Sequence, residues 1–400
     1  MSELKTINRF KFLKLNKERQ RTIAQAPTKP VNPGYPVAKL AHELHPQVQH
    51  VIISEIKEWD KNCKTFTLVP DKDNGTTSLA FFQAGAYISI RLNIGKATLT
   101  RPYSLSSSPR QALAGQYQIT VKRVPNGLAS NYLLDHCPVG TKVNISGPLG
   151  NFTYLPIRDA HTVIGLAGGS GITPFYSLAQ AIADSDEDCR LILLYGSRTA
   201  DSILFHQEFN RLAQKCDKIQ VVNVLSDEER DGYEHGFITA DLIKKYAPQN
   251  EEYSIFMCGP KGMYNFMGKE LTKLHLEQKW IRQEVQGEAH DPNDFDDYKK
   301  HPNIPATVQI TVDINDNQQT ITASSKQTIL QSLEKNGIKA PAHCRSGECG
   351  WCHSRLISGK VFCPISMDHR RAADREFNYV YLCCTYPLSD VTLEVPTAEM

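Results

Sequence analysis

The sequence predicts a multidomain protein: an antiparallel β-barrel, then an α/β domain with a parallel sheet, then a small α+β domain. Its 400 residues exceed what one hydrophobic core usually serves, so several domains are expected. The hydrophobic period also changes along the chain. Short alternating segments fill residues 50–155, and from residue 162 to about 279 apolar runs alternate with helical stretches.

The barrel prediction rests on short segments of alternating polarity, separated by turns rich in Gly, Pro and Asn: 51–56, 87–92, 117–123 and 142–145. The α/β prediction rests on buried-type strands between helices: 163–167, 191–195, 221–225 and 255–258. In the last domain we expect a hairpin at 308–314 and 319–323, a helix at 328–336 and a closing strand at 391–395.

Acidic residues and prolines gather between the second and third domains, a composition typical of a linker. The resulting division is an N-terminal extension at 1–45, the barrel at 46–157, the α/β domain at 158–285, the linker at 286–305 and the α+β domain at 306–400. The extension is basic, and Leu4, Ile7, Phe10 and Leu13 have helical spacing. We expect either a docking helix for a partner or an anionic surface, or a basic segment packed on the next domain; Glu18 and the scarcity of Ser argue against a transit peptide.

Composition narrows the class of protein. A formal charge of +2 gives no reason to expect nucleic-acid binding. No apolar run approaches the roughly 18 residues of a membrane-spanning helix, and the first 25 residues lack the pattern of a secretory signal. We therefore expect a cytoplasmic protein with no membrane span.

The cysteine spacing points to a metal centre. Of eleven cysteines, Cys344, Cys349 and Cys352 form a C-x4-C-x2-C pattern, which lets one loop wrap several thiolates around an iron–sulfur cluster. Gly347 and Gly350 permit the tight turns that aim backbone N–H groups at the sulfurs. Zinc is the alternative, because His343 and His353 flank the loop.

This region resembles the plant-type [2Fe–2S] ferredoxin family, whose domain has a β-grasp fold. The resemblance rests on residues 344–352 (CRSGECGWC), 358–360 (SGK) and 381–387 (YLCCTYP). It implies Cys383 as the fourth ligand, with Cys384 standing where the family commonly has Gln. Cys384 and the nearby Cys363 are left outside the ligand set.

Two patterns in the barrel suit a flavin. In Arg101-Pro102-Tyr103-Ser104 the guanidinium can pair with a diphosphate, the phenol can stack on an isoalloxazine and the hydroxyl can donate to the flavin N5. The alternative is ordinary cross-strand packing. Further along the chain, Gly127 and Ser130 can begin a helix whose free N–H groups face a pyrophosphate. The residues of this second anion site are Lys122, Gly127, Leu128, Ala129 and Ser130.

A glycine-rich turn follows the first strand of the α/β domain. Gly168, Gly169 and Gly171 allow the backbone to approach a pyrophosphate, and Thr173 and Pro174 open the next helix. A tight turn without a ligand is the alternative. Arg198 could pair with the 2′-phosphate of NADPH, whereas Asp201 nearby would discourage it. NADH is slightly favoured, and both donors stay open.

Together with residues 147–152 (GPLGNF) and Cys258-Gly259-Pro260 followed by Met263, these motifs resemble the ferredoxin–NADP reductase superfamily. The resemblance implies FAD, or FMN in some members, in the barrel. It also implies that Cys258 lies near the nicotinamide ring, which makes Ser104 and Cys258 the catalytic candidates. The second phosphate site at 127–130 favours FAD.

The domain order resembles the reductase components of phthalate dioxygenase, phenylacetyl-CoA epoxidase, ketosteroid hydroxylase and the hybrid-cluster protein. This implies electron flow from NAD(P)H through flavin and a [2Fe–2S] cluster to a partner redox protein, an oxygenase or another reductase. Two other hypotheses stay open: a self-sufficient reductase acting on a small organic substrate, and a redox sensor that retains the fold without turnover.

Overall fold

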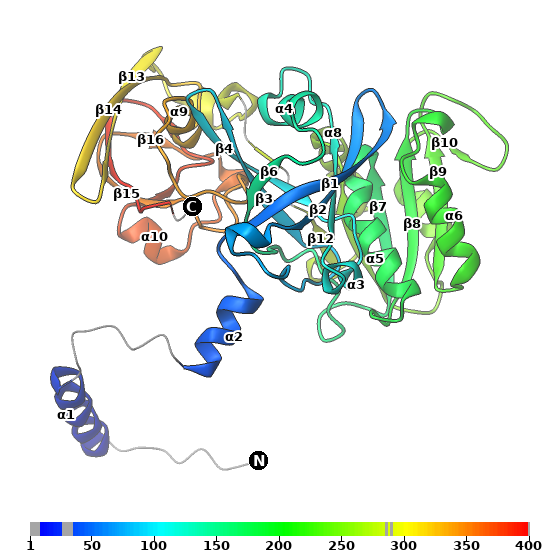
Figure 1. Cartoon of the computed structure of the whole chain (residues 1–400), viewed down its shortest axis with the longest axis horizontal. Helices are drawn as coiled ribbons and strands as arrows, with labels where there is room; N and C mark the ends of the chain where they lie inside the picture. Colours follow the sequence, from blue (N-terminus) through cyan, green and yellow to red (C-terminus); the bar gives the residue numbers. More distant parts are fainter. Residues whose placement is uncertain (1–8, 26–34, 285–286, 289–290, 399–400) are drawn as a thin grey trace. The chain divides into compact units, whose positions relative to one another are not determined.

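The structure is a computed structural model, and it describes residues 9–25, 35–284, 287–288 and 291–398 (Figure 1). The chain divides into two compact units, Met1–Glu43 and Leu44–Met400. The N-terminal unit contains α1 (Arg9–Gln25) and most of α2 (Pro36–Leu44). Leu4 and Ile7 of the expected helical pattern lie outside the described residues. Among the described helices, none is long and apolar enough to cross a membrane.

The second unit begins with an antiparallel sheet in the order β4-β3-β6-β1-β2-β5. Its strands are β1 (Gln49–Asp60), β2 (Cys63–Pro70), β3 (Tyr87–Ile94), β4 (Ala97–Ser104), β5 (Tyr117–Lys122) and β6 (Lys142–Ile145). A bridge between Leu105 and Ile119 joins the two outer strands, so the sheet curls into the expected barrel. Two helices accompany it, α3 (Pro109–Leu113) and α4 (Leu128–His136).

A parallel sheet follows in the order β10-β9-β8-β7-β11-β12. Its strands are β7 (Thr162–Gly168), β8 (Arg190–Ser197), β9 (Ile219–Leu225), β10 (Glu234–His235), β11 (Tyr253–Cys258) and β12 (Ile281–Gln283). One core contains residues of α5 (Thr173–Ala183) and α6 (His206–Lys215), and another contains residues of α7 (Ala240–Tyr246) and α8 (Lys261–Thr272). Alternate strand residues such as Val163 and Ile164 enter different cores, as expected for a sheet covered on both faces.

The C-terminal domain is a mixed sheet in the order β14-β13-β19-β15-β17, with a small β16–β18 ladder beside it. Its elements are β13 (Thr307–Ile314), β14 (Asn317–Ser324), α9 (Ile329–Lys335), β15 (His353–Ser358), β16 (Val361–Phe362), α10 (Ala372–Glu376), β17 (Tyr379–Tyr381), β18 (Tyr386–Pro387) and β19 (Val391–Glu394). The first and last strands pair in parallel, as in a β-grasp fold. The expected multidomain architecture is thereby confirmed.

The acidic segment before this domain is not wholly polar in its packing. It forms short 3₁₀ turns at Pro292–Asp294 and Tyr298–Lys300, and Tyr298 is buried in the C-terminal core. The Tyr298 ring lies 5.2 Å from that of Phe362. Burial of this large aromatic ring stabilises the packing of the segment, while acidic neighbours such as Asp294 and Asp296 remain exposed to water.

Side-chain contacts hold the three domains of the second unit together. Ser177 on α5 donates from its hydroxyl to the carbonyl of Ser107 at 2.7 Å, across the boundary between the barrel and the parallel sheet. Between β4 and α9, which lie side by side in Figure 1, the Thr100 N–H donates to Glu334 Oε1 at 3.2 Å. Strand β4 is therefore in contact with the C-terminal domain.

Candidate functional site

The motif Arg101-Pro102-Tyr103-Ser104 forms the end of β4, where Tyr87 of β3 pairs with Ser104 and Ile90 pairs with Arg101. Burial raises the pKa of the Tyr103 phenol, so the ring stays neutral at physiological pH. A neutral, half-buried phenol can stack against a flat ring system.

The N-terminus of α4 presents an anion site of the expected type. Gly127 is its N-cap, and among the described residues no side chain caps it. The Ser130 hydroxyl instead accepts a hydrogen bond from the Val124 N–H at 3.2 Å, which fixes the turn before the helix. The first-turn N–H groups of Leu128 and Ala129 therefore remain suited to a phosphate. Lys122, at the end of β5, is exposed.

The glycine-rich turn after β7 packs against the end of β11. A Cβ on Gly171 would lie 2.2 Å from the Cys258 carbonyl oxygen, so only glycine fits there. Cβ atoms on Gly168 and Gly259 would lie 2.7 and 2.5 Å from the Met263 sulfur. The predicted nicotinamide residues therefore come together, and Pro260 caps the helix α8 that carries Met263.

Other residues of this half are placed less tightly. Thr173 donates from its hydroxyl to the Ser170 carbonyl at 3.1 Å and so braces the loop. Arg198 is exposed and lies just beyond the end of β8, the strand that pairs with β7. Burial, followed by the charge of Glu284, raises the pKa of the Cys258 thiol, which is therefore neutral at physiological pH.

The predicted flavin and nicotinamide sites lie next to each other. A Cβ on Gly169, in the glycine-rich turn, would lie 4.0 Å from Nζ of Lys122, in the barrel.

The four predicted ligand cysteines converge. The Cys344 thiol contacts those of Cys349 and Cys383, and Cys383 also contacts Cys352. This mutual proximity lowers the pKa of the Cys344 thiol and raises those of the Cys349 and Cys383 thiols. Such a set fits a cluster held by thiolates.

Backbone N–H groups point at the cluster sulfurs. The N–H groups of Ser346 and Cys349 lie 3.5 and 3.4 Å from Cys344 Sγ, and that of Trp351 lies 3.5 Å from Cys349 Sγ. Gly347 and Gly350 have φ angles of +82° and +69°, the left-handed region that favours glycine. This loop shape stabilises negative charge on the sulfurs.

The flanking histidines are engaged elsewhere. His353 lies against the Tyr379 ring at 4.0 Å and its Nε2 is 3.2 Å from Asp374. His343 lies 4.6 Å from the Trp351 ring. Among the described residues, no group of three or more His, Cys, Asp or Glu side chains has the arrangement for a single metal ion. Both flanking histidines thus contact aromatic rings, and the four cysteines remain the proposed ligands.

The loop of residues 344–352, called the cluster loop below, contains Arg345. A buried charge network that was not foreseen from the sequence surrounds this residue. Arg345 Nη1 lies 2.6 Å from Glu334 Oε1, and its Nη2 contacts Glu288. Arg101 pairs with the same two carboxylates, at 3.2 Å from Glu288 and 3.4 Å from Glu334. Arg345 also donates to the Thr100 carbonyl at 3.3 Å. Arg101, predicted to meet a flavin diphosphate, therefore also joins β4 to the cluster loop.

Tyr87 is a second residue that sequence reasoning missed. Besides pairing with Ser104, it has a phenol whose pKa is raised by burial and then by the charges of Cys344 and Cys349. Tyr87 therefore lies near both the flavin motif and the cluster loop. Its isolated place in an ordinary strand gave no signal of this.

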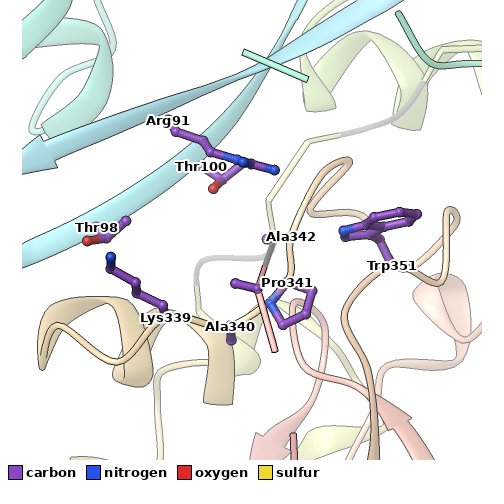
Figure 2. Close-up of a pocket in the computed structure, with 9 residues that line it drawn as sticks. Arg91, Thr98, Thr100, Lys339, Ala340, Pro341, Ala342 and Trp351 are labelled. Atoms are coloured by element: carbon purple, nitrogen blue, oxygen red, sulfur yellow. The ribbon is translucent and has the colours of Figure 1, made fainter. Parts of the chain in front are cut away.

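Two cavities lie at the boundaries between the domains that form the site. One of about 20 Å³ lies between Arg91, Thr98 and Thr100 of the barrel and residues 339–342 and Trp351 of the C-terminal domain (Figure 2). It has room for a water molecule but not for a cofactor. Another of about 340 Å³ is lined by residues of the barrel's end, the parallel sheet and the cluster loop, among them Phe152, Glu284 and Glu348.

Family models match all three parts of the chain. Residues 50–154 match an oxidoreductase FAD-binding domain, residues 166–269 an oxidoreductase NAD-binding domain, and residues 312–388 a 2Fe-2S iron-sulfur cluster binding domain.

Relatives share this arrangement over most of their length. The glycine betaine monooxygenase reductase subunit of Pseudomonas aeruginosa is 27% identical over 355 residues, covering 84% of this chain and 92% of that protein. The 3-ketosteroid-9-alpha-monooxygenase ferredoxin reductase component of Mycobacterium tuberculosis is 31% identical over 318 residues, covering 77% of this chain and 84% of that one. The structure of phthalate dioxygenase reductase has the same fold, with a TM-score of 0.61 at 20% identity, covering 88% of this chain and 98% of that one.

Fold, site and family models together define an oxidoreductase that uses FAD, NAD(H) and a [2Fe–2S] cluster. More narrowly, the chain belongs to the ferredoxin–NADP reductase superfamily, in the group whose flavin reductases carry a C-terminal plant-type ferredoxin domain. It is an NAD(P)H-dependent flavin and iron–sulfur oxidoreductase, as its sequence predicts.

Proposed function

We propose that this protein is the reductase component of an oxygenase system and delivers single electrons to a separate oxygenase. The observation that carries the proposal is the direct contact between the cluster loop and β4, the strand that carries the flavin motif and is called the flavin strand below. Arg345 makes this contact with the Thr100 carbonyl. It brings a two-electron site and a one-electron site together in one chain. Relatives named as monooxygenase reductase components support the same partner class.

In this proposal the cluster ligands are Cys344, Cys349, Cys352 and Cys383. The N–H groups that face their sulfurs favour the charged thiolates and stabilise the cluster's negative charge. Cys349 is exposed, so the cluster lies close to the surface on which a partner would dock.

The flavin and nicotinamide residues act by binding and orientation. Tyr103 would stack on the flavin ring, the Ser104 hydroxyl would donate to the flavin N5, and Arg101, Lys122 and the 127–130 turn would hold its phosphates. The Gly168–Gly171 loop and the Cys258-Gly259-Pro260 segment, both packed against Met263, would hold the nicotinamide nucleotide, and Arg198 would bind near its ribose. The cofactors supply the redox chemistry: hydride donation, its acceptance as a pair, and release of one electron at a time.

The first experiment is an anaerobic visible spectrum of the purified full-length protein, before and after adding NADH or NADPH. We expect flavin and iron–sulfur absorption, bleached at low concentration by NADH and less readily by NADPH. Bleaching by neither nucleotide would exclude the proposed reductase activity. Turnover of a small organic substrate without any partner protein would favour a self-sufficient enzyme instead.

Substitution of one ligand tests the electron path. Cys383→Ser is expected to lose cluster absorption and cytochrome c reduction, while NADH still reduces the flavin. Cys216→Ser, the same change at a partly buried cysteine of the parallel-sheet domain, serves as the control. A Cys383→Ser protein with an unchanged cluster would contradict the assignment.

We also propose a cytoplasmic location and a docking role for the N-terminal extension. The eleven cysteines form no disulfide in the structure, which describes all of them, and this suits a reducing compartment. In α1, Phe10 and Ile23 are exposed among basic residues. Deleting residues 1–43 should leave NADH oxidation with an artificial acceptor intact and lower the rate with the natural partner. An equal rate with the partner would remove the docking role.

A further inference from the structure

Two cysteines outside the proposed ligand set face each other beside the cluster loop. The sulfurs of Cys363 and Cys384 are 3.7 Å apart. Cys363 follows β16, Cys384 precedes β18, and these strands pair with Phe362 opposite Tyr386. The backbone ladder therefore sets this proximity, and modest side-chain rotation would bring the sulfurs to the roughly 2 Å of a disulfide bond.

Exposure differs between the two thiols. Cys363 is partly exposed, whereas Cys384 has 0% of its surface accessible. On its inner side the Cys384 sulfur lies 3.0 Å from where a Cβ on Gly347 would be, at the turn of the cluster loop. A small molecule that approaches from the Cys363 side therefore meets Cys363 before Cys384, whereas the cluster loop is itself exposed at Cys349.

The Cys384 thiol lies beside that of Cys383, and the other contacts described for the two thiols are with carbonyl oxygens. Cys363 Sγ lies 3.9 Å from the Pro364 carbonyl oxygen, and Cys384 Sγ lies 3.5 Å from that of Tyr381. Thiols are weak hydrogen-bond donors, so these contacts cost little to break. Cys63 and Cys189, by contrast, are single buried cysteines of the other domains.

We propose that Cys363 and Cys384 form a hydroperoxide-reactive dithiol site that closes to a disulfide while the cluster remains bound. Cys363 sulfur attacks the peroxide, its S–O bond forms as the O–O bond breaks, and the alcohol or water leaves. Cys384 sulfur then attacks the sulfenic acid, the S–S bond forms, the S–O bond breaks and water leaves. Two thiols are oxidised, one hydroperoxide is reduced, and both thiol protons end in the products.

Such a site would protect the cluster from peroxide, which a reduced flavin in the same molecule can generate. Flavins can pass electrons to O₂, and the peroxide formed would reach the cluster domain of the same molecule. A dithiol beside the cluster loop consumes the peroxide that reaches it and so lowers the amount that attacks the cluster. The inference rests on the proposed ligand set but not on the identity of the partner oxygenase.

The test uses cluster-loaded full-length protein treated with stoichiometric hydrogen peroxide, then alkylated, digested with trypsin without reductant and analysed by mass spectrometry. We expect the peptides 361–370 and 376–400 to be joined, with two thiols lost per peroxide and recovered by dithiothreitol. Cys384→Ser must abolish the joined peptide, which separates Cys384 from its neighbour Cys383. Overoxidised Cys363 beside alkylated Cys384 would overturn the proposal, as would linkage through Cys383 with loss of the cluster.

A second measurement tests protection. Peroxide should bleach the cluster of Cys363→Ser several-fold faster than that of the wild type, and Cys216→Ser should match the wild type. Bleaching by an iron chelator alone should be equal in all three proteins. Equal peroxide bleaching would overturn the protective role, as would a Cys363→Ser cluster that the chelator removes correspondingly faster. A protein that carries no cluster at all would instead refute the proposed function.

Discussion

At the scale of single residues, Gly171 leaves no room for a side chain. A Cβ there would overlap the Cys258 carbonyl, which is backbone and cannot move aside as a flexible side chain could. We expect Gly171→Ala to separate the glycine-rich turn from β11 and lower kcat/KM for NADH by about 10- to 100-fold. Steady-state kinetics with ferricyanide as acceptor measures this.

Gly262→Ala on α8 provides the control, because no described atom lies within 4 Å of its would-be Cβ. It should leave the kinetics unchanged and stabilise the protein by about 0.5 kcal/mol, since alanine lowers the entropy of the unfolded chain. Equal activity in Gly171→Ala and Gly262→Ala would show that the close approach at Gly171 does not matter for nucleotide binding.

At the scale of elements, α9 depends on the residue that caps its N-terminus. Thr328 accepts from the Gln331 N–H at 3.2 Å, and Gln331 Oε1 accepts from the Thr328 N–H at 3.0 Å, so the two form a capping box. Thr328→Ala should destabilise the protein by about 1 kcal/mol in chemical denaturation. Thr397→Ala, at an exposed threonine of the same domain, should have no measurable effect.

Elements with a clear local pattern were predictable. The helix expected at 328–336 is α9 with its caps, and the segment at 51–56 is the middle of the longer strand β1. The barrel and the parallel sheet were likewise predictable from hydrophobic period. The cysteine loop was predictable as a loop because Cys344, Cys349 and Cys352 lie close together in the chain with two glycines among them, whereas Cys383, the distant fourth ligand, is proposed from the resemblance.

Contacts that depend on how domains pack were not predictable. Nothing local distinguishes Glu334 on α9 from a solvated helix residue, yet it is buried against Arg345 and β4. Tyr298 lies in a segment whose polar composition hides one core residue. The role expected for Arg101 came from its motif alone, which says nothing of its carboxylate partners.

At the scale of the whole molecule, the network of Arg101, Glu288, Glu334 and Arg345 connects the flavin strand with the cluster loop. Glu334→Gln weakens the ion pairs on both sides of this seam. We expect NADH to reduce the flavin at the wild-type rate, and electron transfer from flavin to cluster to slow several-fold. Anaerobic stopped-flow spectroscopy separates the two steps, and the exposed Glu376→Gln is the matched control. If both steps keep their wild-type rates, the network does not position the domains for electron transfer.

The same network predicts how stability depends on pH. Glu288 is desolvated, which alone would raise its pKa, but the charges of Arg345 and Arg101 prevail and lower it to about 2. A carboxyl group with a depressed folded-state pKa stabilises the protein fully above its unfolded pKa of about 4.5. This stabilisation, on the order of 3 kcal/mol, is lost as the pH falls from about 4.5 towards about 2.

Glu288→Gln should therefore be less stable than the wild type at neutral pH, and the difference should shrink as the pH falls through that window. Urea denaturation of both proteins across neutral and acidic pH measures the difference directly. Glu376→Gln makes the same chemical change at an exposed position and should show no such trend. A difference between Glu288→Gln and wild type that stays constant with pH would mean that Glu288 contributes by packing and not by its charge, and the network would then lose its electrostatic role in joining the domains.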